Sequence, residues 1–194
     1  MKDRDNQQEI RETDLAWLAG MIEADGFVGM GFQKSPGANG RKLFATKPNV
    51  GFTNQDALLL EKVSNMIKSI SNKNVFFREI KGNFPNSTNS VSLLLTGLQA
   101  VLDLLLAIEP YMIGNKGAKA RLLIKYLESR LSRQRTARGN PPYNIDELLI
   151  IKNFYDNTKR KGGKRNPDVA KILRDYTRDF EVQGNLDEEI VRSA

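Results

Sequence analysis

LAGMIEADG, residues 18–26, closes a predicted helix that spans residues 14–25 and ends at Gly26, with Thr13 or Asp14 as its N-cap. Small residues recur every four positions along this helix and fall on a single face, namely Ala16, Gly20 and Ala24. A face without bulky side chains lets a second helix approach closely. That helix belongs either to the core of the same chain or to a second chain.

Asp25 stands at the carboxyl end of the predicted helix, where the helix dipole disfavours a negative charge by ~0.3–1 kcal/mol. A cation bound to Asp25 explains an acid there better than helix stability does. If two such helices packed side by side, their Asp25 carboxylates would meet, and the repulsion would favour divalent cations between them. The alternative is a surface acid at a turn, because Asp-Gly is common turn chemistry.

From Phe27 onward the sequence has a period of two residues. Val28, Met30 and Phe32 are apolar and alternate with open positions, as in a strand with one buried face. After a loop at 35–40, the patterns predict strands at 43–53, 75–81 and 91–96 and helices at 56–70, 97–108, 116–131, 146–157 and 167–180. The predicted class is α+β in the order αββαββα, with a four-stranded antiparallel sheet and extra C-terminal helices.

The composition restricts the chemistry. The chain has 30 Lys and Arg against 23 Asp and Glu, which gives a net charge of +7 and favours a polyanionic partner. It has no cysteine and no histidine, which excludes disulfides, Cys/His zinc sites and histidine bases. No apolar run approaches the roughly 20 residues that span a bilayer. We expect an intracellular, soluble protein without membrane contact, whose organellar, bacterial or phage compartment is not distinguished.

Residues 18–26 resemble the LAGLIDADG motif, with Met21 and Glu23 as conservative departures. By this resemblance the chain is identified as a single-motif member of the LAGLIDADG homing endonuclease family, and the similarity in element order covers roughly residues 13–133. The resemblance implies a site-specific DNA endonuclease that makes metal-dependent double-strand breaks in a long, near-palindromic target. Because each chain carries one motif, the implied enzyme is a homodimer.

The resemblance also implies site residues. Asp25 becomes the catalytic acid and a metal ligand, and the backbone carbonyl of Ala24 a second ligand, for Mg²⁺ or Mn²⁺. Asn54, with Gln55 beside it, matches the polar residue after the family's second strand. Lys116 matches the lysine at the start of the helix after the fourth strand. Both would assist the metal-bound water, although Asn54 is also a plausible N-cap and Lys116 a plausible solvated lysine.

The implied dimer interface lies on the motif helix, and we assign to it Ala16, Ala19, Gly20 and Glu23. The resemblance implies double-stranded DNA as the partner, and a sheet with one open face is of the kind that can lie in the major groove and read base edges. Candidate DNA contacts are Gly29, Gly31 and Gln33 by alternation, Lys34, Arg41 and Lys47 from the connecting loop, and Arg78 with Lys81 from the third strand. Each of these charges by itself is more often simply solvated.

Residues 1–133 form the predicted endonuclease core, and residues 134–194 a basic, helical C-terminal extension of the same domain. The arginine-rich run that leads into the extension is a candidate for loop-like phosphate contacts. It contains Arg130, Arg133, Arg135 and Arg138. A solvated disordered stretch is the alternative interpretation of this run.

Two other functions fit the same pattern. The first is an RNA maturase that assists splicing of a group I intron, and it predicts RNA affinity that survives loss of Asp25. The second is a non-catalytic DNA-binding regulator on the same fold. Absence of the motif acid would favour the regulator, and Asp25 is present.

Overall fold

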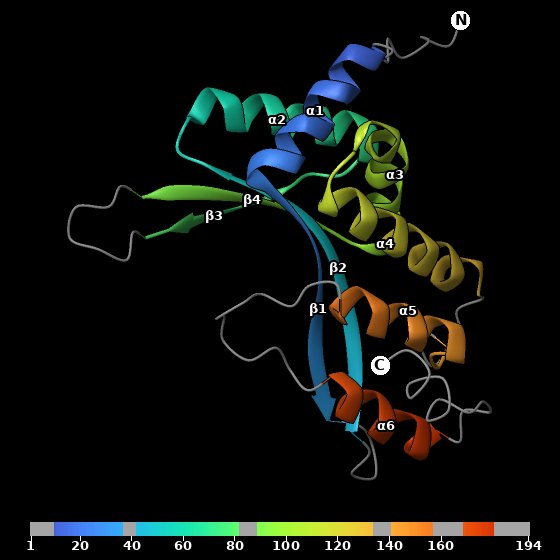
Figure 1. Ribbon diagram of the computed structural model, residues 1–194. Coiled ribbons are helices and arrows are strands. Elements are labelled where there is room, and N and C mark those ends of the chain that lie inside the picture. The colour runs from blue at the N-terminus through green and yellow to red at the C-terminus, as the bar shows by residue number, and fades with distance from the viewer. Residues whose placement is uncertain (1–9, 37–41, 82–88, 134–140, 157–168, 181–194) are drawn as a thin grey trace, which may run out of the picture.

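A computed structural model describes residues 10–36, 42–81, 89–133, 141–156 and 169–180. Within these residues the predicted order of helices and strands is confirmed (Figure 1). The elements are α1 (Glu12–Asp25), β1 (Gly26–Pro36), β2 (Lys42–Asn54), α2 (Ala57–Ser71), β3 (Phe76–Ile80), β4 (Ser90–Thr96), α3 (Leu98–Ile108), the 3-10 turn η2 (Glu109–Tyr111), α4 (Asn115–Ser132), α5 (Ile145–Asp156) and α6 (Val169–Phe180).

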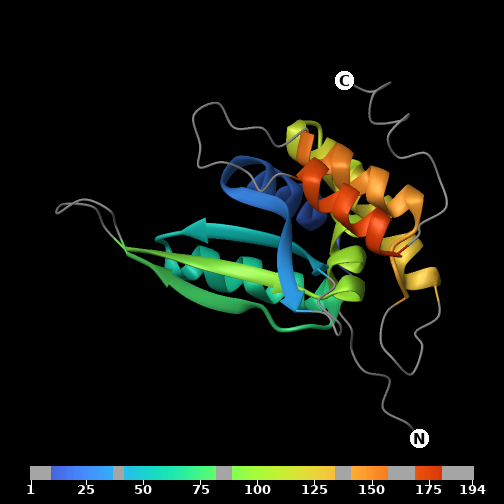
Figure 2. The ribbon, with the colours of Figure 1, turned by 90° about the horizontal axis from the view of Figure 1, so that it is seen from below.

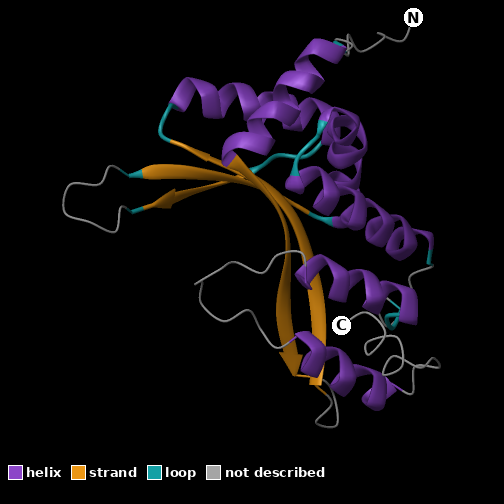
Figure 3. Ribbon diagram, viewed as in Figure 1, coloured by secondary structure: helices purple, strands orange, loops and turns teal. Residues whose placement is uncertain are grey.

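The strands form one four-stranded antiparallel sheet, as predicted, and their order in the sheet is β1-β2-β4-β3 (Figure 3). Strands β1 and β2 form a long hairpin that pairs from Gly26 opposite Phe52 to Pro36 opposite Lys42. Strand β4 pairs with residues 49–54 of β2 only. The first half of β2 therefore has β1 as its only strand partner among the described elements.

Helices α1 to α4 pack against one face of the four-stranded part of the sheet. Figure 2 looks onto the opposite face, with α2 behind the strands. Alternate strand residues point into the core as the period of two predicts: Val28 and Met30 in β1 and Val50 and Phe52 in β2 are buried. No described helix covers the opposite face of this part of the sheet, which leaves it available for a partner.

Helices α5 and α6 lie beside the outer half of the β1-β2 hairpin (Figure 1). Their buried side chains, among them Leu148, Ile151 and Leu173, belong to the same hydrophobic cluster as the core of α1 to α4. A hairpin of two strands is marginally stable without further packing. The extension therefore stabilises the part of the hairpin that β4 does not reach.

Tyrosine side chains join the extension and α4 to this hairpin. The Thr46 amide, which has no β4 partner, donates to the Tyr143 hydroxyl at 3.0 Å. The Tyr126 hydroxyl bonds to Thr46 Oγ1, and the Tyr155 hydroxyl donates to the Met30 carbonyl. These bonds satisfy backbone and side-chain groups that the sheet leaves unpaired, so they fix the hairpin against the helices.

A buried ion pair holds the start of α5 to the end of α4. Asn144 and Glu147 form a capping box, because each side chain accepts from the other's backbone amide, at 3.1 and 2.8 Å. The fully buried Glu147 carboxylate also binds Arg130 at 3.1 Å and Arg133 at 2.9 Å. The interpretation of Arg130 as part of a loop-like run is wrong, since it lies in α4 and is 8% exposed.

The described residues contain no helix that is both long and apolar enough to cross a membrane.

Candidate active site

Helix α1 has two different faces. Leu18, Ala19 and Ile22 are fully buried against the rest of the chain. Ala16, Gly20 and Ala24 are exposed, and a Cβ built on Gly20 would have no neighbouring atom within 4 Å. The small-residue face is thus free within the described part of this chain. Ala19 is on the other face, and its burial removes it from any surface that a second chain could contact.

Asp25 is the last residue of α1 and is exposed. The chain passes directly from Asp25 into β1, and the Gly26 amide donates to the Ile22 carbonyl to end the helix. A Cβ on Gly26 would lie 2.7 Å from Ile22 Cα and 2.8 Å from the Gly51 carbonyl oxygen, so no side chain fits. The close packing of helix end and sheet at Gly26 fixes the position of Asp25.

Lys116, in the first turn of α4, reaches the carboxyl end of α1. Its Nζ donates to the carbonyls of Ile22 (3.1 Å), Glu23 (2.6 Å) and Ala24 (3.0 Å). These carbonyls carry the negative end of the helix dipole, which favours a cation. The predicted catalytic lysine is therefore brought to the residue beside Asp25, and the alternative of a freely solvated lysine does not hold.

Glu23 makes the reverse contact. Its Oε1 accepts from the Gly114 amide at 3.2 Å and from the Gly117 amide at 3.0 Å, both at the start of α4, where backbone amides lack full intrahelical bonding. Gly117 has no room for a side chain, because a Cβ would lie 2.8 Å from the Met112 carbonyl oxygen. Glu23 thus caps a helix of its own chain, a role that sequence reasoning missed when it placed Glu23 at the dimer interface.

Asn54 ends β2 at the same end of the β1-β2 hairpin as Asp25, since Gly26 pairs with Phe52. Its Oδ1 accepts from the amides of Gln55 (2.8 Å) and Asp56 (3.0 Å). The N-cap of α2 is Asp56, not Asn54. Asn54 therefore shapes the turn before the helix, and these bonds use only its amide oxygen.

The open face of the sheet carries several of the predicted DNA contacts. Lys47 was expected in the connecting loop, and this expectation is wrong. It lies in β2 opposite Gly31 and is exposed on the open face. Arg78 in β3 is opposite Ser92 and is also exposed, as is Lys81 after β3. Gly29 lies opposite Asn49 on the same face. Gly29, Lys47 and Arg78 therefore share the open face, which continues from the Asp25 end of the sheet, whereas Lys81 lies beyond the last paired residue of β3.

The other predicted DNA contacts are less direct. Gln33 and Lys34 continue β1, opposite Ala45 and Phe44, so Lys34 is in a strand and not in a loop. The Arg133 guanidinium is bound to Glu147 at 2.9 Å. Arg41 and Arg135 lie outside the described residues.

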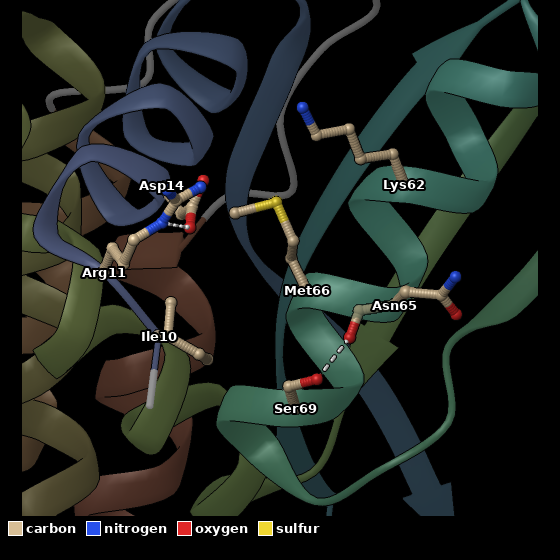
Figure 4. Close-up of a pocket in the computed structure, with 7 residues that line it drawn as sticks. All are labelled: Ile10, Arg11, Asp14, Lys62, Asn65, Met66 and Ser69. Carbon is tan, nitrogen blue, oxygen red and sulfur yellow. Dashed lines mark hydrogen bonds and ion pairs between the residues drawn. The ribbon is translucent and has the colours of Figure 1, made fainter. Parts of the chain in front are cut away.

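A shallow cavity of about 280 Å³ lies between the first turn of α1 and helix α2 (Figure 4). Its charged residues already have partners: Arg11 pairs with Asp14 at 3.1 Å, and Lys62 lies over the Trp17 ring. The cavity is at the opposite end of α1 from Asp25. We therefore place the candidate active site at the carboxyl end of α1 and not in this cavity.

The sequence matches no protein-family model and no curated protein. The fold, however, is that of the homing endonucleases of the LAGLIDADG type, as residues 18–26 implied. The archaeal intron-encoded homing endonuclease I-Vdi141I, complexed with DNA, is 16% identical, with 86% of this chain and 96% of that chain covered and a TM-score of 0.62.

Two further structures have the same fold. I-CvuI, in complex with its target in the presence of 2 mM Ca, is 15% identical, with 89% of this chain and 98% of that chain covered and a TM-score of 0.60. The LAGLIDADG homing endonuclease I-GzeII, in complex with its DNA target, is 14% identical with a TM-score of 0.51, and 88% of this chain covers 50% of it. Although the sequence identities are low, the structural similarity establishes a shared fold.

Proposed function

We propose that the protein is a site-specific DNA endonuclease that cuts both strands as a homodimer and depends on Mg²⁺ or Mn²⁺. The observation that carries the proposal is the exposed Asp25 at the end of α1, with the Lys116 ammonium at the same helix end, on a helix whose small-residue face no described residue covers. The fold adds support, because the solved structures that share it include homing endonucleases bound to DNA.

The second chain completes the proposed site. One chain supplies one motif and one Asp25, whereas double-strand cutting needs a reacting centre for each strand. We assign Ala16, Gly20 and Ala24 to the contact between the α1 helices of the chains. Among the described residues, no atom lies within 4 Å of a Cβ built on Gly20. Ala19 and Glu23 are left out of this contact, because Ala19 is in the core and Glu23 caps α4.

The donors at this helix end suit a hard divalent cation. No described group of three or more Asp, Glu, His or Cys could hold a metal ion within one chain. Mg²⁺, however, commonly binds one or two carboxylates and keeps several waters, which an Asp25 from each chain would satisfy. The Ala24 carbonyl, which accepts from Lys116, would join them through its second lone pair. A bound cation of this kind acidifies a water molecule and stabilises a leaving oxygen.

The remaining residues have supporting roles in the proposed hydrolysis, in which a water oxygen attacks phosphorus and one P–O bond breaks. Lys116 places a positive charge beside the carbonyl of Ala24 at 3.0 Å, where it stabilises negative charge that develops near Asp25. Asn54, at the same end of the strands, has amide hydrogens that can orient the attacking water. Arg78 and Lys47 bind the DNA from the open face.

Cleavage of supercoiled plasmids tests the proposal. The plasmids carry duplexes selected for binding to the protein, and they are incubated with Mg²⁺ or with Ca²⁺. We expect Mg²⁺-dependent double-strand cutting by the native chain and loss of cutting with retained DNA binding in Asp25→Asn. The matched control is Asp14→Asn, an acid at the other end of α1, which should cut normally. Equal cutting by Asp25→Asn would reject this active site.

A further inference from the structure

One row of residues crosses all four strands on the open face of the sheet. Phe27 in β1 pairs with Gly51 in β2, Gly51 pairs with Leu94 in β4, and Leu94 pairs with Phe76 in β3. Directly opposed residues of antiparallel strands point to the same face. With a strand spacing of about 4.8 Å, this apolar row is about 14 Å long.

The large side chains of the apolar row are accessible to solvent. Phe76 is 61% exposed and Phe27 37% exposed, and Leu94 is partly exposed. The Phe27 ring lies across Gly51 and fills the space in which a side chain at that position would lie. Aromatic rings held in this way on a surface, with no core to enter, indicate a binding contact.

The surroundings of the apolar row are polar and positive. On one side, Thr53 and Arg78 each lie opposite Ser92. On the other side, Asn49 lies opposite Gly29, followed by Lys47 opposite Gly31. A hydrophobic row between hydrogen-bonding and cationic side chains is complementary to a ligand that is charged at its borders and has apolar groups within. In a chain of net charge +7, duplex DNA is such a ligand.

We propose that the apolar row contacts the 5-methyl groups of thymines in the major groove, and this inference rests on the proposed function. Thymine is the only DNA base with an apolar group on its major-groove edge. Bases in an intact duplex are stacked, so they offer their edges and not their faces to Phe27 and Phe76. Since Phe27 follows Asp25 by only two residues, these thymines lie in the part of each half-site nearest the cut.

The test removes single methyl groups from the DNA. The full-length protein first selects duplexes from a random pool in Ca²⁺. Each thymine of a selected duplex is then replaced in turn by deoxyuridine, which differs only by the methyl group. We expect Kd to rise roughly fourfold at one or more thymines per half-site, as burying a single methyl-sized group implies. In Phe76→Ala or Phe27→Leu, the same replacement should change Kd much less.

Phe77→Ala is the matched control. Phe77 is the next residue of β3 and is 56% exposed, but it pairs with the buried Leu93 and so points to the opposite face. This variant should keep the full effect of methyl removal. Equal Kd for thymine and deoxyuridine at every position of a selected duplex would overturn the inference but leave the proposed function intact. Binding of single-stranded RNA without any duplex selection would overturn both.

Discussion

Glu23 and Lys116 each stabilise the end of the helix that carries the other residue. The Glu23 carboxylate accepts from the first amides of α4, and the Lys116 ammonium donates to the last carbonyls of α1. In each contact, a charged side chain lies at the helix end that carries the opposite partial charge. This exchange fixes α4 against α1 next to Asp25, so stability and the geometry of the candidate site depend on the same side chains.

Glu23→Ala should lower the free energy of unfolding by about 1–2 kcal/mol, the usual cost of losing a helix cap. Glu23→Gln, which keeps an oxygen acceptor, should cost less. Urea denaturation of both variants measures this difference. If Glu23→Ala is as stable as the native chain, the capping role is wrong.

Glu147→Ala should be more harmful than most substitutions in the chain. It leaves Arg130, whose side chain is 6% exposed, without its carboxylate, and breaking a buried ion pair typically costs about 3–5 kcal/mol. The thermal unfolding midpoint should fall accordingly. Glu128→Ala, on the exposed side of α4, serves as the control and should change it little. A small effect of Glu147→Ala would contradict the structural role assigned to this ion pair.

Helix α1 combines a face that builds the core with a small-residue face that no described part of the chain contacts. Glycine inside a helix costs about 0.5–1 kcal/mol relative to alanine. Gly20 has open space around it, so the folding of a single chain does not require it. Close approach of another helix gives a reason for glycine at this position.

Gly20→Ala should therefore raise the stability of the monomer by about 0.5–1 kcal/mol while it weakens the dimer. Urea denaturation at low protein concentration and sedimentation equilibrium measure these effects separately. Asn65→Ala on the exposed side of α2 controls for a general gain in helix propensity and should leave the dimer unchanged. An unaltered dimerisation constant in Gly20→Ala would exclude the proposed helix contact.

The outer β1-β2 hairpin should loosen at high pH. Burial raises the pKa of Tyr155 to about 12, and it also raises the pKa of Tyr126 and of Tyr176. Because these values exceed those of the unfolded chain, the tyrosines contribute stability that is complete below about pH 10 and is lost as the pH rises through the folded pKa. Urea midpoints across this window should fall, and less steeply in Tyr155→Phe. Superimposable pH curves for both proteins would contradict this prediction.

For the molecule as a whole, sequence patterns predict the elements well because periodicity is a local property. The change from helix to strand at Gly26 and the apolar positions Val28 and Met30 needed no knowledge of the rest of the chain. Long-range contacts gave no such signal. The hydrogen bond from the Lys116 ammonium to the Glu23 carbonyl joins elements that only the folded chain brings together, and so does the ion pair of Arg133 with Glu147. Lys47 was assigned to the connecting loop although it falls inside the strand predicted at residues 43–53, and the structure places it in β2, in agreement with the periodicity.

The proposed function requires that each chain of a dimer contributes one Asp25 to a shared site. The most direct measurement uses mixed dimers of native and Asp25→Asn chains, isolated through a different affinity tag on each chain, on a selected target in Mg²⁺. We predict that the mixed dimer loses double-strand cutting but binds the target as tightly as the native dimer. Cutting of both strands by the mixed dimer at the native rate would contradict the shared site.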